Sequence, residues 1–129
     1  MIFKRKEGFR FSFGEPLDAG FVVMIDGKPI GTRESRLACK VLDVSPRGMK
    51  MMTEADLSSY INKVLQLEIS FTLDHTEIRG IGEIVWSKKF GSGYQYGIVF
   101  YNQPGVESLI ISELKARRRK ETFGSKNQG

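Results

Sequence analysis

Apolar and polar residues alternate without interruption between positions 65 and 73, and this run constrains the fold more than any other feature of the sequence. Its apolar members are Leu65, Leu67, Ile69, Phe71 and Leu73. Successive side chains of a strand point to opposite faces, so the run predicts a strand with one apolar face and one polar face. An apolar face has to be buried against another element, so this strand requires a sheet around it.

Shorter segments with the same alternating or extended character precede and follow this run. Turn signals separate them, such as Asp26-Gly27-Lys28-Pro29 and Asp74-His75-Thr76, and we expect a break at Glu15-Pro16 and a loop over Lys88 to Gly93. Thr53 to Asp56 favours a short helical turn, with Thr53 as its N-cap. The expected strands are Phe9–Phe13, Ala19–Ile25, Arg36–Leu42, Gly48–Met52, Leu65–Leu73, Ile78–Trp86 and Tyr94–Tyr101.

The period of the apolar residues changes after Pro104 from that of a strand to that of a helix. Val106, Leu109, Ile110 and Leu114 are spaced for one helical face, with Pro104 suited to the first position. The sequence therefore predicts an all-β fold, a small antiparallel barrel of six or seven strands followed by one C-terminal α-helix, since closure removes exposed edges. We expect one domain over residues 1–120 and a disordered tail over residues 121–129.

The composition indicates the size of the core, the charge of a binding partner and the cellular compartment. With 129 residues and 40% hydrophobic residues, it suits a single core, and a net charge of +5 favours an anionic partner. The longest apolar run, Phe21 to Ile25, is too short to cross a bilayer, so we expect no membrane insertion. One cysteine excludes an internal disulfide and favours a reducing, cytoplasmic setting.

The inventory of reactive side chains does not favour an enzyme. His75 is the only histidine and falls in a predicted turn, where we expect it to be exposed. Cys39 falls on the apolar face of its strand and is expected to be buried. The carboxylates are scattered, and no pair is arranged as general acid and base. We therefore predict no catalytic residues, no metal site and no cofactor.

Two polar features favour a binding module instead. Lys4, Arg5, Lys6 and Arg10 place four positive charges in a leader that enters the first strand. The second feature is the strand-to-turn stretch from Asp43 to Gly48, in which Asp43 and Ser45 project to the same side. Either feature alone is also compatible with a plain outcome, a solvated basic arm or an ordinary hairpin turn. Together they form a clamp suited to an anionic, planar ligand, because arginine can pair with phosphate and also stack on a purine.

These two features resemble the sequence pattern of the PilZ domain, the bacterial receptor module for cyclic di-GMP. The family pattern is Arg-x-x-x-Arg in the leader, then Asp/Asn-x-Ser-x-x-Gly about thirty residues later. The second part is complete as Asp43, Ser45 and Gly48, and the first reads Lys6-Glu7-Gly8-Phe9-Arg10, preceded by Arg5. Gly82 to Trp86 and Tyr96 to Phe100 also resemble the closing strands of the family, and the resemblance covers roughly residues 4–115.

The resemblance implies a cytoplasmic receptor or adaptor whose ligand is cyclic di-GMP and whose output is read by an effector protein. It implies that Arg5 and Arg10 contact guanine and phosphate and that Lys6 contacts phosphate. Asp43, Ser45 and the Gly48 backbone would form the opposite wall. The leader would be mobile without ligand and would fold over the bound nucleotide. Lys6 departs from the pattern, because lysine keeps the charge but lacks the planar fork of arginine.

Two other functions remain open at the level of sequence. A protein with the same fold could act as an adaptor by protein contact without binding a nucleotide. Alternatively, a small basic barrel could bind single-stranded nucleic acid on an aromatic platform made by Tyr94, Tyr96 and Tyr101, helped by the basic cluster from Lys115 to Lys120. Strand alternation and solvated helix-end charges explain these residues more simply, so we do not expect nucleic acid as the partner.

Overall fold

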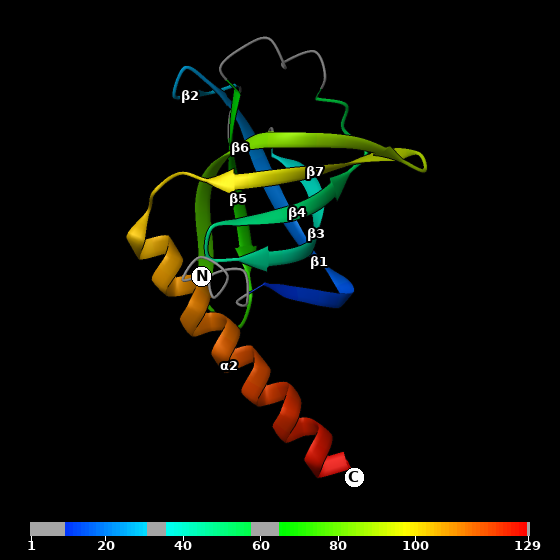
Figure 1. The fold of residues 1–129 in the computed structure, drawn as a ribbon, viewed down its shortest axis with the longest axis vertical. Helices are drawn as coiled ribbons and strands as arrows, with labels where there is room; N and C mark the ends of the chain where they lie inside the picture. Colours follow the sequence, from blue (N-terminus) through cyan, green and yellow to red (C-terminus); the bar gives the residue numbers. More distant parts are fainter. Residues whose placement is uncertain (1–9, 31–35, 58–64, 129) are drawn as a thin grey trace, which may run out of the picture.

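The computed structural model describes residues 10–30, 36–57 and 65–128, with side chains described as far as residue 121. Two features make up this part of the chain, a curved antiparallel sheet and one long helix (Figure 1). The elements are β1 (Phe11–Ile25), β2 (Lys28–Pro29), β3 (Leu37–Ser45), β4 (Gly48–Thr53), β5 (Leu65–Thr72), β6 (Glu77–Phe90), β7 (Gly93–Phe100) and α2 (Pro104–Gln128).

The sheet closes on itself into a barrel. Its strand order is β2-β1-β3-β4-β7-β6-β5, and an additional antiparallel pairing joins β1 to β5, from Gly20↔Ser70 to Ile25↔Leu65. Six strands therefore form the closed wall, and the two-residue strand β2 extends the end of β1. The predicted fold class, an antiparallel barrel of six or seven strands with a C-terminal helix, is confirmed.

The barrel interior is filled by the apolar faces that the alternation predicted. Leu67, Ile69, Phe71 and Leu73 are all nearly excluded from solvent, and Phe21 of β1 lies directly across from Ile69. Burying a side chain of this size contributes about 1.5–3 kcal/mol, so this row accounts for much of the stability of the β1–β5 closure. Cys39 is also buried, as predicted, and burial raises the pKa of its thiol to about 12.

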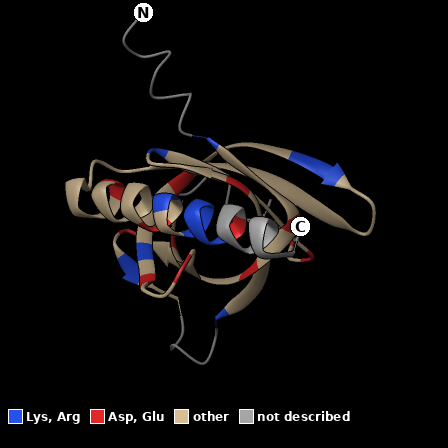
Figure 2. Ribbon diagram, turned by 90° about the horizontal axis from the view of Figure 1, so that it is seen from below, with Lys and Arg blue, Asp and Glu red and all other residues tan. Residues whose placement is uncertain are grey.

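Helix α2 covers one end of the barrel. It begins at Pro104, as expected, and its apolar stripe faces inward: Ile110 and Leu114 belong to the core, while Val106 and Leu109 pack at its margin. Figure 2 views the molecule from this end and shows α2 crossing in front of the strands, with basic positions gathered in its middle. Within the described ranges, no helix has both the length and the apolar character needed to cross a bilayer.

Two predicted strand boundaries are wrong. Glu15-Pro16 does not end a strand, because β1 continues through it with a shift in the register against β3 between Ser12 and Leu17. The expected loop over Lys88 to Gly93 is a tight turn, because β6 continues to Phe90 and β7 starts at Gly93. Gly91 supplies the positive φ of 61° that this turn needs.

Thr53 is the last residue of β4 and not the N-cap of a helical turn. Its hydroxyl donates to the carbonyl of Ala38 at 2.8 Å and accepts from the backbone N–H of Ala55 at 3.3 Å. Residues 54–57 are not helical, and the chain from 58 to 64 lies outside the described residues. Thr53 therefore ties the end of β4 to β3 and starts a turn.

Candidate functional site

A one-residue bulge in β3 decides which way the candidate site faces. Val41 pairs with Met51 and Asp43 pairs with Lys50, so Leu42 is an extra residue on the β3 side of the ladder. Without the bulge, Asp43 would follow Val41 into the apolar interior. The extra residue shifts the alternation, so Val44 enters the core and Asp43 lies on the outer face.

Asp43 lies on the outer face but is almost covered by cations. The residue is 5% exposed, and its Oδ1 accepts a hydrogen bond from Nη1 of Arg10 at 2.9 Å. Nζ of Lys50 lies 3.7 Å from the other carboxylate oxygen. The side chain of Arg10 is 53% exposed, so much of its guanidinium is open to solvent. The Asp43 carboxylate thus holds Arg10 and Lys50 at the barrel surface. Both side chains have further N–H groups that can donate hydrogen bonds to an anion.

Ser45 and Gly48 face each other across the two-residue turn at Pro46 and Arg47. The Ser45 hydroxyl donates to the carbonyl oxygen of Gly48 at 3.3 Å, and both residues are buried. A β-carbon at Gly48 would collide with the carbonyl of Ile98 on β7. Glycine is therefore required here because β7 approaches the backbone closely, and not because of a positive φ, which Gly48 does not have.

The pairing of strands continues the Asp43 position into a row across the outer face. Asp43 pairs with Lys50, Lys50 with Gly97, and Gly97 with Trp86. A second bulge, at Val85, puts Trp86 on this face, because Ile84 pairs with Ile98 and the next pair is Trp86 with Gly97. The indole lies over Gly97, where any β-carbon would collide with it, and Trp86 is 43% exposed. The row therefore ends in an accessible flat aromatic surface.

The sequence predictions missed Lys50 and Trp86. The position of Lys50 has a signal in the sequence, because a two-residue turn at Pro46 and Arg47 places Lys50 opposite Asp43. Trp86 has no comparable signal, since its orientation depends on the bulge at Val85. Of the residues that were predicted, Arg10 contacts Asp43, and Ser45 contacts Gly48 at the adjacent turn. Arg5 and Lys6 lie outside the described residues.

Two aromatic contacts connect the start of β1 to helix α2. Phe11 and Phe13 follow Arg10 directly, and their ring centroids are 5.1 Å apart. The guanidinium of Arg117 lies over Phe13 at 5.0 Å, and that of Arg118 lies over Phe11 at 5.6 Å. Cation–π contacts of this kind contribute about 0.5–1 kcal/mol each at exposed sites. The segment that carries Arg10 is therefore attached to the helix as well as to Asp43.

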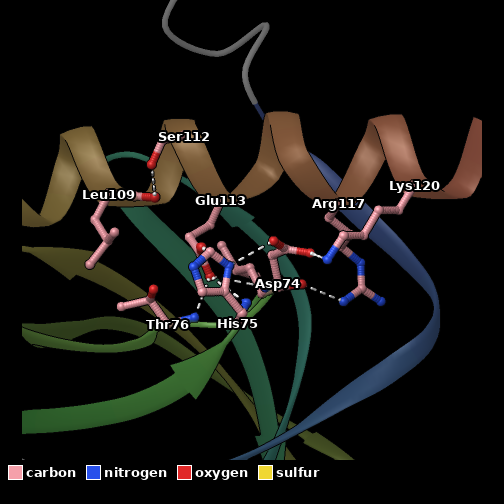
Figure 3. Close-up of polar contacts among 9 residues, drawn as sticks. Asp74, His75, Thr76, Leu109, Ser112, Glu113, Arg117 and Lys120 are labelled. Carbon is pink, nitrogen blue, oxygen red and sulfur yellow. Dashed lines mark hydrogen bonds and ion pairs between the residues drawn. The ribbon is translucent and has the colours of Figure 1, made fainter.

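A second polar cluster joins α2 to the β5–β6 turn at the end of the barrel (Figure 3). Oε1 of Glu113 accepts hydrogen bonds from three backbone N–H groups, those of Asp74, His75 and Thr76, each at 3.0 Å. Nζ of Lys120 lies 2.7 Å from Oδ1 of Asp74. The His75 side chain is 75% exposed, as predicted for a turn residue, with Nδ1 2.9 Å from Asp74 Oδ2.

These contacts of Glu113, Asp74 and Lys120 attach helix α2 to the β5–β6 turn, and we call them the Glu113 lock. Burial raises the pKa of Glu113, but the three backbone N–H groups and His75 together outweigh it and hold the pKa below its ordinary value. Hydrogen bonds from Lys120 and His75 lower the pKa of Asp74. The carboxylates of Asp74 and Glu113 and the ring nitrogen of His75 lie within 4.8 Å of one another, a spacing that could hold a cation. Their oxygens already accept from Lys120 and from the turn backbone, which explains the grouping without a metal.

Comparisons with known proteins agree on one fold. A family model described as "PilZ domain" matches residues 5–116. No curated protein matches the sequence. Several solved structures also resemble the chain. The PilZ domain with c-di-GMP of YcgR from Escherichia coli has a TM-score of 0.62 and 14% identity, and the match covers 92% of this chain and 95% of that one.

YcgR from Escherichia coli in complex with c-di-GMP has a TM-score of 0.64 and 15% identity. That match covers 94% of this chain but 49% of the other, so this chain spans about half of that longer protein. The PilZ domain of CeSA from a cellulose synthesizing bacterium has a TM-score of 0.54 and 15% identity, covering 83% of this chain and 95% of that one. At these identities the structural likeness shows the shared fold.

Proposed function

This chain belongs to the PilZ domain family, and on that premise we propose that it is a receptor for cyclic di-GMP that signals to an effector protein. The proposal places it in the cytoplasm as one domain over residues 1–120, from which helix α2 continues to Gln128. It assigns no catalytic residue, metal or cofactor to the chain.

The observation that carries the proposal is the contact between Arg10 and Asp43. These residues are 33 positions apart in the sequence. Arg10 belongs to the basic leader and Asp43 to the strand-to-turn stretch, which are the two halves of the predicted clamp. Asp43 holds the guanidinium at the barrel surface while leaving the side chain half exposed. A guanidinium fixed in this way can stack on a guanine, or bond its O6 and N7, without first being ordered by the ligand.

We propose that the nucleotide lies over the row formed by Asp43, Lys50, Gly97 and Trp86. Arg10 and Arg5 contact guanine and phosphate, and Lys6 contacts phosphate. Asp43, Ser45 and the Gly48 backbone supply the opposite wall. Two residues extend this set: Lys50, a cation beside Asp43, and Trp86, whose exposed indole stacks on a base. The basic leader, which carries Arg5 and Lys6, folds over the nucleotide, and the effector reads the altered surface.

Calorimetric titration of cyclic di-GMP into the protein tests the proposal. We expect saturable heat with a stoichiometry of one or two nucleotides per chain, and no saturable heat with GMP or with a single-stranded oligonucleotide of equal charge. Because the contacts are fixed and few, the affinity should fall less steeply with salt than that of a nucleic-acid binder that releases many counterions.

Two other outcomes would contradict the receptor. No heat at high protein concentration would mean that the chain works as an adaptor of the same fold without a nucleotide. Stronger binding of the oligonucleotide, with steep loss of affinity in salt, would mean that a nucleic acid is the ligand.

A further inference from the structure

The outer face that carries the candidate nucleotide row continues toward the tip of the β6–β7 hairpin. Along these strands, alternate residues share this face. The row after Trp86 contains Lys40, Met52, Gln95 and Lys88, since Lys40 pairs with Met52, Met52 with Gln95, and Gln95 with Lys88. Beyond it, Phe90 pairs with Gly93 at the start of the turn. Strands rise about 3.3 Å per residue, so Phe90 lies roughly 13 Å from Trp86 along β6.

An open groove of about 890 Å³ occupies this part of the barrel. It is bounded by β1, the start of β3, the end of β4 and the hairpin tip, and it is mainly apolar. Phe90 is 47% exposed although it is a large hydrophobic residue, and Ala38 and Met52 also line the groove. An exposed aromatic side chain beside a mainly apolar hollow forms a seat for an apolar side chain from outside.

The charges around the groove indicate what else the occupant carries. On the side toward the nucleotide row lie Lys40 and Lys88, both exposed, and then Lys50. Lys40 is paired with Asp18 at 2.7 Å, whereas Lys88 lies on the same face without a carboxylate partner among the described residues. At the opposite wall stands Glu54, which is exposed. Lys88 therefore favours an acidic group at the hairpin edge of the groove, whereas Asp18 and Glu54, which line the groove, disfavour one inside it.

We propose that this groove is the docking site for a segment of the effector protein that presents an apolar anchor residue followed by an acidic residue. The anchor enters between Ala38, Met52 and Phe90, and the acidic residue points toward Lys88. This assignment rests on the proposed receptor function in calling the partner an effector. A segment bound here lies beside the proposed nucleotide row, so a bound nucleotide can change its affinity without a long-range change in the barrel.

Selection from a random peptide library displayed on phage tests the site, using the full chain without nucleotide as the target. We expect enrichment of sequences with a Leu, Met or Phe anchor and a nearby Asp or Glu. Synthetic versions of the enriched peptides should bind at least tenfold more weakly to Phe90→Ser and to Lys88→Glu than to the unmodified chain, as measured by fluorescence anisotropy. Val85→Ser removes a more exposed hydrophobic residue, 53% exposed, that does not line the groove, and should leave binding unchanged.

Several results would overturn the proposal. They are enriched peptides that are basic or lack an apolar anchor, peptides that bind Phe90→Ser as tightly as the unmodified chain, and no enrichment at all. Sedimentation showing a dimer that Phe90→Ser dissociates would assign the groove to a second copy of this chain instead. A thermal unfolding transition within about 3 °C of the original shows that Phe90→Ser still folds. If it does not, Met52→Ser replaces it.

The outcomes for the groove and for the receptor are separable. Phe90→Ser should bind cyclic di-GMP as the unmodified chain does, because Phe90 lies outside the nucleotide row. If selected peptides depend on Phe90 but cyclic di-GMP does not bind, the receptor function fails and the groove remains as the site of an adaptor. If the nucleotide binds and no peptide depends on Phe90, only the groove proposal fails.

Discussion

Asp43 is a carboxylate on the outer face of a barrel, yet it is only 5% exposed because two cations and the strand pairing cover it. A buried carboxylate without partners would be strongly destabilising, so Arg10 and Lys50 have a role in the folded protein whether or not a ligand is present. The same contact holds the guanidinium in one place before a ligand arrives. Binding then requires less ordering of side chains, which improves affinity.

Replacing Arg10 with alanine should reduce the affinity for cyclic di-GMP by roughly tenfold to a hundredfold, since a charge-assisted contact contributes roughly 1.5–3 kcal/mol. Calorimetry measures the change. Arg79→Ala is the matched control, because Arg79 is exposed on β6 and pairs with Glu77, away from the nucleotide row. An equal loss of affinity in both variants would mean that general charge, and not the position of Arg10, governs binding.

Replacing Trp86 with alanine should weaken binding about five- to a hundredfold, because stacking of a base on an aromatic ring contributes about 1–3 kcal/mol. Trp86→Phe keeps a smaller stacking surface and should lose less. The nearby Val85→Ala, at a residue that is also exposed, should not change the affinity. Unchanged binding in Trp86→Ala would place the nucleotide away from this row.

Replacing Lys6 with arginine should tighten binding or leave it unchanged, since arginine restores the planar fork while keeping the charge. Affinity measured by calorimetry decides this as well. A marked loss of affinity in Lys6→Arg would mean that the leader motif is wrongly aligned.

At the residue scale, the sequence was informative where chemistry depends on local spacing. Asp43, Ser45 and Gly48 form a compact motif, and the two-residue turn that follows Ser45 also places Lys50 opposite Asp43. The contact between Arg10 and Asp43 is not local: the sequence assigned the two residues to the two halves of a clamp, but only the fold brings them within hydrogen-bond distance. Trp86 could not be predicted, because a single extra residue at position 85 decides whether its side chain points into the core or out of it.

At the scale of elements, helix α2 is held on the barrel by the Glu113 lock as well as by its apolar stripe. Glu113 accepts hydrogen bonds from three backbone N–H groups of the β5–β6 turn, and Arg117 donates a hydrogen bond to the carbonyl oxygen of Leu73 at 2.8 Å. These contacts provide hydrogen-bond partners for backbone groups of the turn that lie beyond the last β5–β6 strand pair. The first turns of α2 bury Ile110 in the core, and the lock fixes the next ones.

Acidification should weaken this attachment. The pKa values of Glu113 and Asp74 are lowered in the folded protein, so both stabilise it above the pKa they have when unfolded. That stability is lost as the pH falls below about 4.5 toward the lowered values. Unfolding in urea, followed from pH 7 down to pH 3, should show this decline.

Glu113→Gln keeps an acceptor oxygen but removes the charge, so its stability should be lower at pH 7 by roughly 1.5–3 kcal/mol and should fall less on acidification. Glu54→Gln, at an exposed residue, is the control and should keep the original pH profile. If Glu113→Gln shows the full acid decline, the loss belongs to other carboxylates.

The elements show which sequence signals are reliable. The strict alternation in β5 and the helical spacing after Pro104 identified their elements, because both follow from which residues are buried. The continuity of β1 through Pro16 did not appear in the sequence. Proline has no N–H to give to a ladder, but the ladder with β3 is already irregular between Ser12 and Leu17, so little is lost there. The end of β6 was missed because Lys88 and Lys89 are polar and exposed on a hairpin that leaves the core.

At the scale of the whole molecule, closure of the barrel separates the core from the candidate site. The interior is filled by apolar side chains, so a ligand meets the outer face of β3, β4, β7 and β6 rather than a cavity inside. Ligand contacts can change without disturbing the core, which suits a small receptor. Phe11 and Phe13 connect the Arg10 segment to Arg117 and Arg118 on α2.

The location of the bound nucleotide tests the account most directly. Two-dimensional ¹H–¹⁵N NMR of the labelled protein, titrated with cyclic di-GMP, should shift the amides of Ser45, Gly48, Lys50 and Gly97 and the indole N–H of Trp86. The amides of the distant turn at Asp74 to Thr76 should stay in place. Shifts confined to that turn or to α2, with the Trp86 indole unmoved at saturation, would contradict a site on the outer face between Arg10 and Trp86.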